Sequence, residues 1–495
     1  MAVLNIMITN ASLKDIQGAL SATMEEGSWV STSFLAAEIV IIPLSGWMCQ
    51  VFSLRRYIVG TTIVFLILSV MTAFAWDIYS MIVIRALSGF AGGALIPVSF
   101  SIILTTLPAS KQPIGLGIWS LTATQAPSLG PTLGGWLTES YGWEYIFYLQ
   151  LIPGLVMVSG LWYGLPREKM NLSLLKEGDW FGILLMAIGL AASTIVLEEG
   201  NRKDWFGSDL IVRGTIVGVV ALSLFILVEL RGRNPFINLR LLGRRNFAIA
   251  NLVNVIFGMG LFGSIYLLPL YFAQIQGYNS FQIGTVIMWT GIPQLFLVPV
   301  VIKLMQFVDP RKLVAFGVTV FGASYFMNVF LTHDSAYDQF MWANIVRSMG
   351  QPFILVCLSV VATTGLDKEH AGSASGLFNG MRNLGGAIGI ATLATFVTRR
   401  QHFHSNHVMQ KLSSYDPETL DKVEQLQQHF LDFNGDLDLA RTQALSSLRH
   451  IARQETLVLA YSDAFFLLGC AFAITLPIVF FLTPTKPSLG NSNGD

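Results

Sequence analysis

The sequence predicts an all-α integral membrane protein, folded as a bundle of fourteen transmembrane helices. Hydrophobic residues make up 53% of the 495 positions and charged residues only 12%, whereas soluble proteins carry roughly 25% charged residues. Apolar runs of about 20 residues, the length that crosses a bilayer, recur along the chain. The formal net charge is zero, so no overall basic field indicates a nucleic-acid partner.

The amino-terminal apolar run is short. It offers only about a dozen apolar positions before Lys14, roughly half of a membrane span. It also lacks the basic flank and the cleavage site of a signal peptide. We therefore expect either a truncated first helix or a start site placed too late.

Thirteen longer apolar runs follow, and each is predicted to span the membrane. Their approximate limits are 28–49, 56–76, 79–106, 113–138, 143–165, 179–197, 211–229, 247–273, 280–305, 311–332, 339–365, 371–398 and 458–482. A polar segment, 399–457, separates the last two. Cys49, Cys357 and Cys470 lie singly within or beside these runs, so they are predicted to be small apolar residues rather than disulfides or metal ligands.

Basic residues mark alternate loops. They are Arg55, Arg56, Lys111, Arg167, Lys169, the five arginines between 231 and 245, Arg311, Lys312 and Lys368. The intervening short loops carry few basic residues. By the positive-inside rule, both termini are predicted to be cytoplasmic, and segment 399–457 is predicted to lie outside the cytoplasmic (cell inner) membrane.

An internal repeat divides the chain. The stretch that begins at Pro43 aligns without gaps with the stretch that begins at Pro299, so that Arg55 matches Arg311 and Arg56 matches Lys312. We expect an amino-terminal six-helix half, an inserted helix pair, a carboxy-terminal six-helix half and a cytoplasmic tail, with limits 1–165, 166–245, 246–484 and 485–495. Repeat-built transporters bind substrate between their halves near the membrane midplane, so this pattern favours a solute carrier.

The span 113–138 is unusually rich in glycine and proline. These residues are Gly115, Gly117, Pro127, Gly130, Pro131, Gly134 and Gly135. Such a span is tolerated in lipid only where neighbouring protein covers it, so an interior position is predicted. Gly130 and Gly134 lie on one face, and Pro131 loosens the hydrogen-bond ladder between them. The pattern indicates a hinge or a sliding contact; a static close-packed helix pair is the alternative.

Seven stretches along the chain carry a family resemblance. They are WVSTSFLAAEIVIIPLSGW, RALSGFAGGALIP, LGPTLGG, GWEYIFYLQLIPG, LEEGNRKDWF, NPFINLRLLGRRNF and SGLFNGMRNLGGAIG. With them the chain resembles the fourteen-span drug:proton antiporter family of the major facilitator superfamily, above all the inner-membrane pumps of Emr-type tripartite efflux systems. The resemblance implies proton-coupled efflux of amphipathic drugs or lipophilic small molecules by alternating access. It also implies a periplasmic membrane-fusion adaptor and an outer-membrane channel as partners, and an antiporter motif within the span 113–138.

Two motifs depart from the family pattern. The cytoplasmic gate loop after the second span keeps only some of the residues of the family motif. The internal repeat provides an equivalent loop in the second half. The predicted gate-loop residues of the two loops are Gly46, Arg55, Arg56, Asp309, Arg311 and Lys312. On the first span, the family's acidic position holds Asn5, which cannot exchange a proton near neutral pH. These departures leave open an alternative, a non-transporting membrane sensor or scaffold that has lost proton coupling.

Charged side chains inside predicted spans mark candidate sites, because a charge in lipid is costly. Glu38 has no basic neighbour in its own span, and Arg85 lies within about two helical turns of it in depth. Burial favours a neutral carboxyl, whereas a nearby arginine favours the ionised form. We therefore predict that the proton-coupling site has moved from Asn5 to Glu38, with Arg85 as its partner.

Further polar residues in the spans are predicted to line the substrate cavity. They are Gln125, Arg347, Asn379, Arg382 and Asn383. Arg347 and Arg382 are the counterparts of Arg85 in the second half. A structural role, in which each arginine ties helices together through carbonyls and amide side chains, is an equally weighted alternative.

Segment 399–457 is soluble in composition. A pair of amphipathic helices is expected, one capped by Asp416 and with an apolar face that comprises Leu420, Val423, Leu426 and Phe430. His402, His404 and His407 resemble a metal cluster, but without adjacent cysteine or acidic ligands a solvated loop is favoured. No metal or other cofactor is expected. No nucleophile and base pattern or phosphate-binding loop indicates an enzyme.

Overall fold

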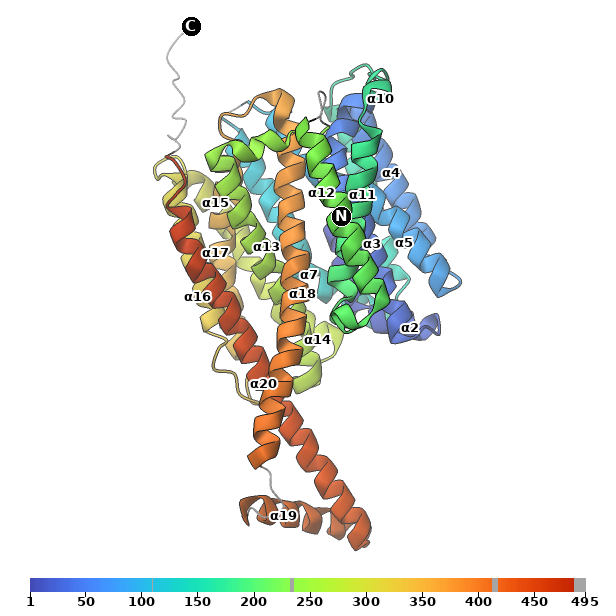
Figure 1. The fold of residues 1–495 in the computed structure, drawn as a ribbon, viewed down its shortest axis with the longest axis vertical. Helices are drawn as coiled ribbons and strands as arrows, with labels where there is room; N and C mark the ends of the chain where they lie inside the picture. The colour runs from blue at the N-terminus through green and yellow to red at the C-terminus, as the bar shows by residue number, and fades with distance from the viewer. Residues whose placement is uncertain (109, 232–235, 412–416, 485–495) are drawn as a thin grey trace.

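The computed structural model describes residues 1–108, 110–231, 236–411 and 417–484. Every regular element within these ranges is a helix (Figure 1), which confirms the predicted fold class. The first part of the chain forms α1 (Ala2–Ala11), α2 (Leu13–Ala19), α3 (Met24–Phe52), α4 (Leu54–Ala73), α5 (Ile78–Gly93), α6 (Leu95–Thr106), α7 (Gln112–Tyr141), α8 (Tyr145–Tyr148) and α9 (Leu151–Gly164).

The rest of the chain continues in the same way. The middle forms α10 (Leu174–Glu177), α11 (Trp180–Glu199), η1 (Trp205–Gly207) and α12 (Asp209–Arg231). The last part forms η2 (Leu239–Gly243), α13 (Arg245–Tyr271), η3 (Phe272–Gln276), α14 (Ser280–Ile287), η4 (Met288–Thr290), α15 (Ile292–Leu304), α16 (Pro310–Phe326), α17 (Tyr337–Thr363), η5 (Lys368–His370), α18 (Ala371–Lys411), α19 (Pro417–Asn434) and α20 (Leu437–Val479).

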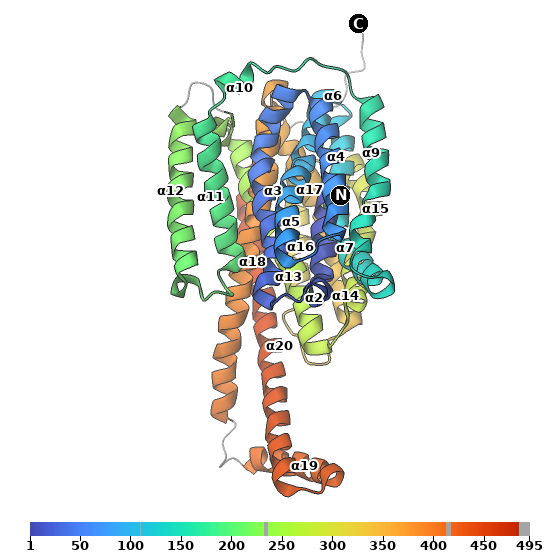
Figure 2. The same cartoon turned by 90° about the vertical axis from the view of Figure 1, so that its right-hand side faces the viewer.

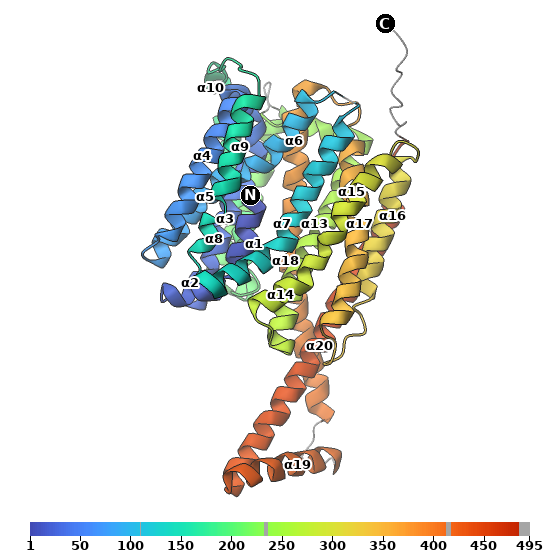
Figure 3. The same ribbon diagram turned by 180° about the vertical axis from the view of Figure 1, so that it is seen from behind.

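The helices have the dimensions of a multi-pass membrane protein. Within the described ranges, ten helical segments are long and apolar enough to cross a membrane, and α1 is a shorter apolar helix. The predicted spans 113–138, 311–332 and 371–398 correspond to α7, α16 and α18, which are not among the ten but run alongside them in the bundle (Figure 3). The thirteen predicted long spans and the short first helix therefore all have helical counterparts, consistent with a count of fourteen.

Two predicted spans are interrupted where glycine or proline occurs. The span 79–106 is divided into α5 and α6, which meet at Ala94 just after two glycines, and the span 280–305 is interrupted at Gly291, two residues before Pro293. Proline lacks the N–H that continues the helical ladder. In lipid, backbone freed in this way has to be covered by protein. In the span 280–305, α14 and α15 pack on α7 and α17, which supply that cover.

Helices of the two predicted halves pack directly on one another. α3 packs on α18, and α7 packs on α14 and α15. The inserted helices α11 and α12 lie side by side on one flank of the bundle (Figure 2). Because α11 contacts both α3 and α18, the inserted pair touches both halves.

A pair of amphipathic helices was expected in segment 399–457, which instead contains α19 and the extensions of two longer helices. α18 and α20 continue without interruption beyond the predicted span limits at 398 and 458, and together with α19 they form a stalk that projects from the bundle (Figure 1). The chain has no glycine or proline between 390 and 411, so the helix continues through this stretch although its residues become polar. α19 ends at Asn434, and Gly435 follows it with a φ of +67°, the left-handed conformation typical of a helix terminus; Asp436 then caps α20. The predicted cap Asp416 lies outside the described residues.

The orientation of the bundle gives a first testable prediction. The stalk and α10 lie at opposite ends of the molecule (Figure 1), as expected if the basic linkers are cytoplasmic and the stalk is outside. In a variant without the three native cysteines, Leu420→Cys in intact cells should react with an impermeant maleimide, whereas Arg240→Cys should react only after lysis. Both positions are exposed, so equal labelling from outside would contradict this topology.

Candidate functional site

A buried polar cluster lies where α1, α3 and α5 meet. Arg85 on α5 is fully buried, and its Nη1 donates a hydrogen bond to the Oδ1 of Asn5 on α1. Its Nε lies 3.4 Å from the carbonyl oxygen of Val30, and its guanidinium carbon lies 4.2 Å from the ring centroid of Phe34. The structure thus brings together Asn5 and Arg85, both singled out from the sequence, and gives Arg85 the carbonyl and amide partners of a helix-tying arginine.

Glu38 lies beside this cluster and faces the other half of the molecule. α3 and α18 run antiparallel, since Gly46 meets the backbone of Gly372 and Pro43 meets Gly376. Continuing that register places Glu38 level with Arg382. The positive charges of Arg382 and Arg85 both act on Glu38.

Several polar atoms of this group have no hydrogen-bond partner among the described residues. Glu38 is 2% exposed, and its Oε2 is buried and unpaired. The Nε and Nη1 of Arg382 are also buried and unpaired, and its guanidinium carbon lies 5.3 Å from the ring centroid of Trp119 on α7. A buried charge without a full set of partners is unfavourable. The arrangement therefore leaves hydrogen-bonding capacity for a proton, a water molecule or a substrate.

Arg347 forms a second, separate buried centre in the carboxy-terminal half. It is fully buried, and none of its three guanidinium nitrogens has a hydrogen-bond partner in the part of the chain that the structure describes. Its guanidinium carbon lies 4.7 Å from the ring centroid of Tyr325, whose hydroxyl donates to the carbonyl oxygen of Gly260 at 2.7 Å. Unlike Arg382, Arg347 is not among the charges that act on Glu38.

The glycines of α7 allow close contact with both halves. A Cβ added to Gly130 would lie 2.5 Å from the Cβ of Met7, and one added to Gly134 would lie 2.9 Å from the carbonyl oxygen of Ile8. Two further glycines of the predicted motif also meet the other half: Gly117 meets Ile302, and Gly135 meets the backbone of Ser280 and Phe281. Pro127 and Pro131 of the motif are buried. α7 is therefore wedged between α1 of its own half and α14 and α15 of the other.

Polar side chains join α7 to the broken helix opposite. The Nε2 of Gln125 donates to the carbonyl oxygen of Gly291 at 2.6 Å, and the hydroxyls of Ser128 and Thr290 lie 2.7 Å apart. Gln125 was predicted to line the substrate cavity, and the structure places it in this contact between the halves. Asn379 is buried, with its Nδ2 bonded to the carbonyl oxygen of Ser375 and its Oδ1 unpaired, and Asn383 is half-buried on the same helix.

The two loops related by the internal repeat make equivalent contacts. The Nη1 of Arg55 donates to the carbonyl oxygen of Leu165, just after the last helix of the first half, at 3.3 Å. The Nη1 of Arg311 donates to the carbonyl oxygen of Leu482, just after the last helix of the second half, at 3.0 Å. Asp309 caps α16 and forms an ion pair with Arg311 at 2.9 Å. Of the other predicted gate-loop residues, Arg56 and Lys312 are exposed, and Gly46 allows α3 to meet α18.

The end of α11 and the loop after it connect to both halves through polar contacts that the sequence reasoning missed. The Oε1 of Glu199 accepts hydrogen bonds from Ser28 at 3.0 Å and from Thr32 at 2.9 Å, both on α3. In the following loop, the Nε1 of Trp205 donates to the hydroxyl of Thr395 on α18 at 2.8 Å. Glu199 and Trp205 belong to the stretch LEEGNRKDWF. Its two adjacent acidic residues at the end of an apolar run were the sequence feature from which these contacts could have been suspected.

The histidines at 402–407 lie on α18, so the expected loop is in fact helical. The Nε2 of His404 lies 2.7 Å from the Oδ2 of Asp463 on α20, and the Nε of Arg400 lies 2.6 Å from the same oxygen. These contacts join α18 to α20 at the base of the stalk. Over the described ranges, no group of three or more His, Cys, Asp or Glu side chains has the arrangement of a metal site.

Comparisons with known proteins agree with this architecture. A family model described as "Major Facilitator Superfamily" matches residues 1–390. The chain is 30% identical to the "Colistin resistance protein EmrB" of Acinetobacter baumannii over 98% of this chain and 94% of that protein. It is 28% identical to the "Multidrug export protein EmrB" of Escherichia coli over 100% of this chain and 95% of that protein. The solved structure of the human organic anion transporter MFSD10 shares the fold, with a TM-score of 0.59, 13% identity, and coverage of 95% of this chain and 97% of that one.

Proposed function

Because the chain belongs to the major facilitator superfamily, we propose that it exports amphipathic or lipophilic small molecules across the cytoplasmic membrane in exchange for protons. Relatives that match over nearly their whole length are named for multidrug export and drug resistance. Transporters of this architecture work by alternating access between two halves. No observation favours the alternative, a non-transporting sensor or scaffold.

The position of Glu38 is the observation that carries the proton-coupling part of this proposal. It is a buried carboxyl on α3 with Arg85 in its own half and Arg382 across the contact with the other half. An ionised Glu38 attracts Arg382 and favours the state in which α3 and α18 are close. Protonation removes that attraction, and separation of the halves then opens the cavity to the other side. Proton uptake by Glu38 is thereby linked to the movement of α3 relative to α18. Asn5 accepts the hydrogen bond of Arg85 throughout.

The buried arginines support a substrate that carries hydrogen-bond acceptors. Arg347 and Arg382 present donors without partners among the described residues, and a buried donor without an acceptor costs free energy. We propose that an acceptor group of the substrate satisfies them in turn during transport, with Asn379 and Asn383 nearby on α18. The apolar remainder of the substrate lies against hydrophobic walls, as is usual for ligand cavities.

Reconstitution tests the proposal directly. Purified protein in vesicles with an imposed pH gradient should move a lipophilic fluorescent dye against its concentration gradient, and the dye should accelerate dissipation of the pH gradient. A protonophore should abolish both signals. If the pH gradient decayed at the same rate with and without the dye, and with and without the protein, the result would instead support the non-transporting alternative.

We further propose that the stalk contacts a periplasmic adaptor. α19 packs against α20, and Val423, Leu426 and Phe430 of α19 are half-buried, whereas Leu420 is 50% exposed. Part of the apolar face is thus covered by the chain itself, and part is available to a partner. With a photo-crosslinking residue in place of Leu420, we expect capture of a membrane-fusion adaptor in cells that express one. The same residue in place of Leu426 should crosslink mainly within the chain, and intrachain products from both positions would contradict the adaptor contact.

A further inference from the structure

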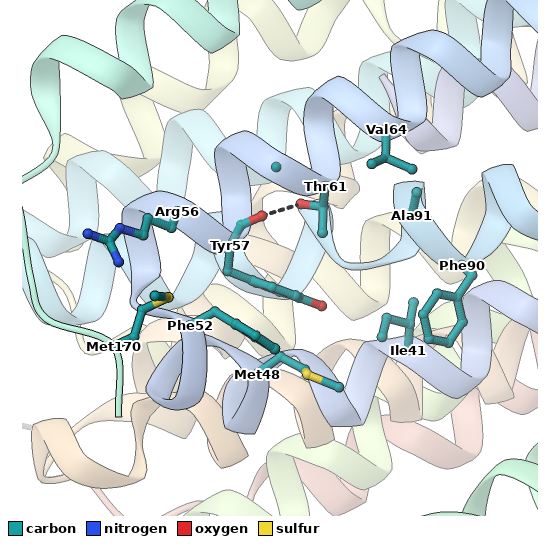
Figure 4. Close-up of a pocket in the computed structure, with 11 residues that line it drawn as sticks. Ile41, Met48, Phe52, Arg56, Tyr57, Thr61, Val64, Phe90, Ala91 and Met170 are labelled. Atoms are coloured by element: carbon teal, nitrogen blue, oxygen red, sulfur yellow. Dashed lines mark hydrogen bonds between the residues drawn. The ribbon is translucent and has the colours of Figure 1, made fainter. Parts of the chain in front are cut away.

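A groove of about 380 Å³ lies between α3, α4 and α5, away from the contact between the halves. Figure 4 shows its apolar walls, which include Ile41, Met48, Phe52, Val64 and Phe90. Val64 and Phe90 are 47% and 45% exposed on the outer surface of these membrane-spanning helices. The groove therefore opens toward the hydrocarbon of the bilayer.

Two residues of α4 give the groove its shape. Gly60 has no side chain, and a Cβ added there would meet nothing within 4 Å. The hydroxyl of Tyr57 is buried and has no hydrogen-bond partner among the described residues, and Figure 4 shows it pointing between Met48, Ile41 and Phe90. The hydroxyl of Thr61 is already bonded to the carbonyl oxygen of Tyr57 at 2.9 Å. The hydroxyl of Tyr57 is thus a free donor in apolar surroundings.

A cation lies at one end of the groove. Arg56 lines it beside Met170, which comes from the linker after α9 (Figure 4). Arg56 is exposed and forms no ion pair or hydrogen bond within the described part of the chain, and Arg167 and Lys169 of the same linker are exposed as well. From Arg56 to Val64 the groove follows α4 for about 12 Å, at 1.5 Å per residue. It therefore combines a basic end near the membrane surface with an apolar channel directed into the bilayer.

We propose that this groove binds one acyl chain of an anionic membrane phospholipid, with the lipid phosphate at Arg56. A guanidinium pairs well with phosphate oxygens, and basic residues at the membrane surface attract anionic lipids. The ester oxygens next to the phosphate are acceptors of the kind that the hydroxyl of Tyr57 lacks. An apolar groove open to lipid is filled by the chain of a neighbouring lipid rather than by water, because the groove offers water too few polar partners.

Photolabelling of the full-length protein tests the proposal. The protein is reconstituted in phosphatidylethanolamine vesicles that contain a small fraction of phosphatidylglycerol with a diazirine on one acyl chain, and labelled peptides are identified after illumination. We expect label on α4 and α5 around Thr61 and Phe90. Phosphatidylcholine with the same acyl diazirine should label these peptides less, and Arg56→Gln should reduce this headgroup preference.

Two matched glycine substitutions provide the decisive comparison. Gly60→Leu fills the groove and should lower labelling about tenfold, the change expected from losing contact with roughly two methylene groups. Gly160 on α9 is also exposed, with nothing within 4 Å of an added Cβ, so Gly160→Leu should leave labelling unchanged. Undiminished labelling in Gly60→Leu, or equal labelling by the two lipids, would overturn the proposal.

Discussion

Glu38→Gln is expected to reduce transport driven by a pH gradient to the level of empty vesicles, while dye binding is retained. Glutamine keeps the size of the side chain and its hydrogen-bonding capacity, but it cannot take up or release a proton. The negative charge that attracts Arg382 in our proposal would therefore be absent in every state. Proton-coupled efflux measured in reconstituted vesicles, alongside dye affinity measured by fluorescence in detergent, separates the loss of coupling from the loss of binding.

Glu229→Gln is the matched control for this experiment. Glu229 is also a buried carboxyl in a membrane-spanning helix, but its Oε1 accepts a hydrogen bond from the backbone N–H of Ile237 at 2.7 Å, in the inserted pair. A glutamine oxygen preserves that bond, so this variant should remain coupled. Normal pH-driven efflux by Glu38→Gln would rule out Glu38 as the proton-coupling residue. An equal defect in both variants would indicate that buried carboxyls are needed for folding rather than for coupling.

Gly134→Leu and Gly130→Leu are expected to abolish efflux without preventing membrane insertion. A Cβ at either position already approaches α1 to within 3 Å, at the carbonyl oxygen of Ile8 or the Cβ of Met7. A leucine side chain is far larger, so α1 or α7 has to move, and overpacking of this kind costs about 1–3 kcal/mol or more. Because α7 also packs on α14 and α15, the displacement reaches the contact between the halves.

Drug resistance of cells that express each variant, together with its abundance in the membrane fraction, provides the measurement. Gly160→Leu is again the control, since it adds the same side chain to a lipid-facing helix where nothing lies within 4 Å. Full resistance with Gly134→Leu would mean that α1 moves aside freely and that the close contact has no role in transport. Absence of the variant from the membrane would instead assign the glycine to folding.

The sequence predicted the helices well because the length of an apolar run is set directly by the thickness of the bilayer. The internal repeat was equally informative: it paired Arg55 with Arg311, and both donate to a carbonyl just beyond the last helix of their half. α18 continues beyond the predicted span limit at 398, and α20 begins before the limit at 458. Apolarity shows where lipid ends, whereas helix termination depends on capping and on glycine or proline.

The partners of the buried charges were harder to predict. Depth along the helix suggested Arg85 as the neighbour of Glu38, but a second neighbour is Arg382, more than 300 residues away in the sequence. Its proximity depends on the antiparallel packing of α3 on α18, which no local pattern encodes. For the same reason the contacts of Glu199 and Trp205 with the two halves became visible only in the folded chain.

The unbroken course of α18 and α20 from the bundle into the stalk has a mechanical consequence. A continuous helix is stiff, and the part of α20 from Leu437 to Leu457 is about 30 Å long at 1.5 Å per residue. If the second half tilts as a rigid body by about 10°, this lever carries α19 sideways by roughly 5 Å. The tip thereby amplifies a small rotation within the bilayer into a displacement that a bound protein can follow. A load applied at the tip would, by the same rigidity, act on the helices around Arg382 from outside the membrane.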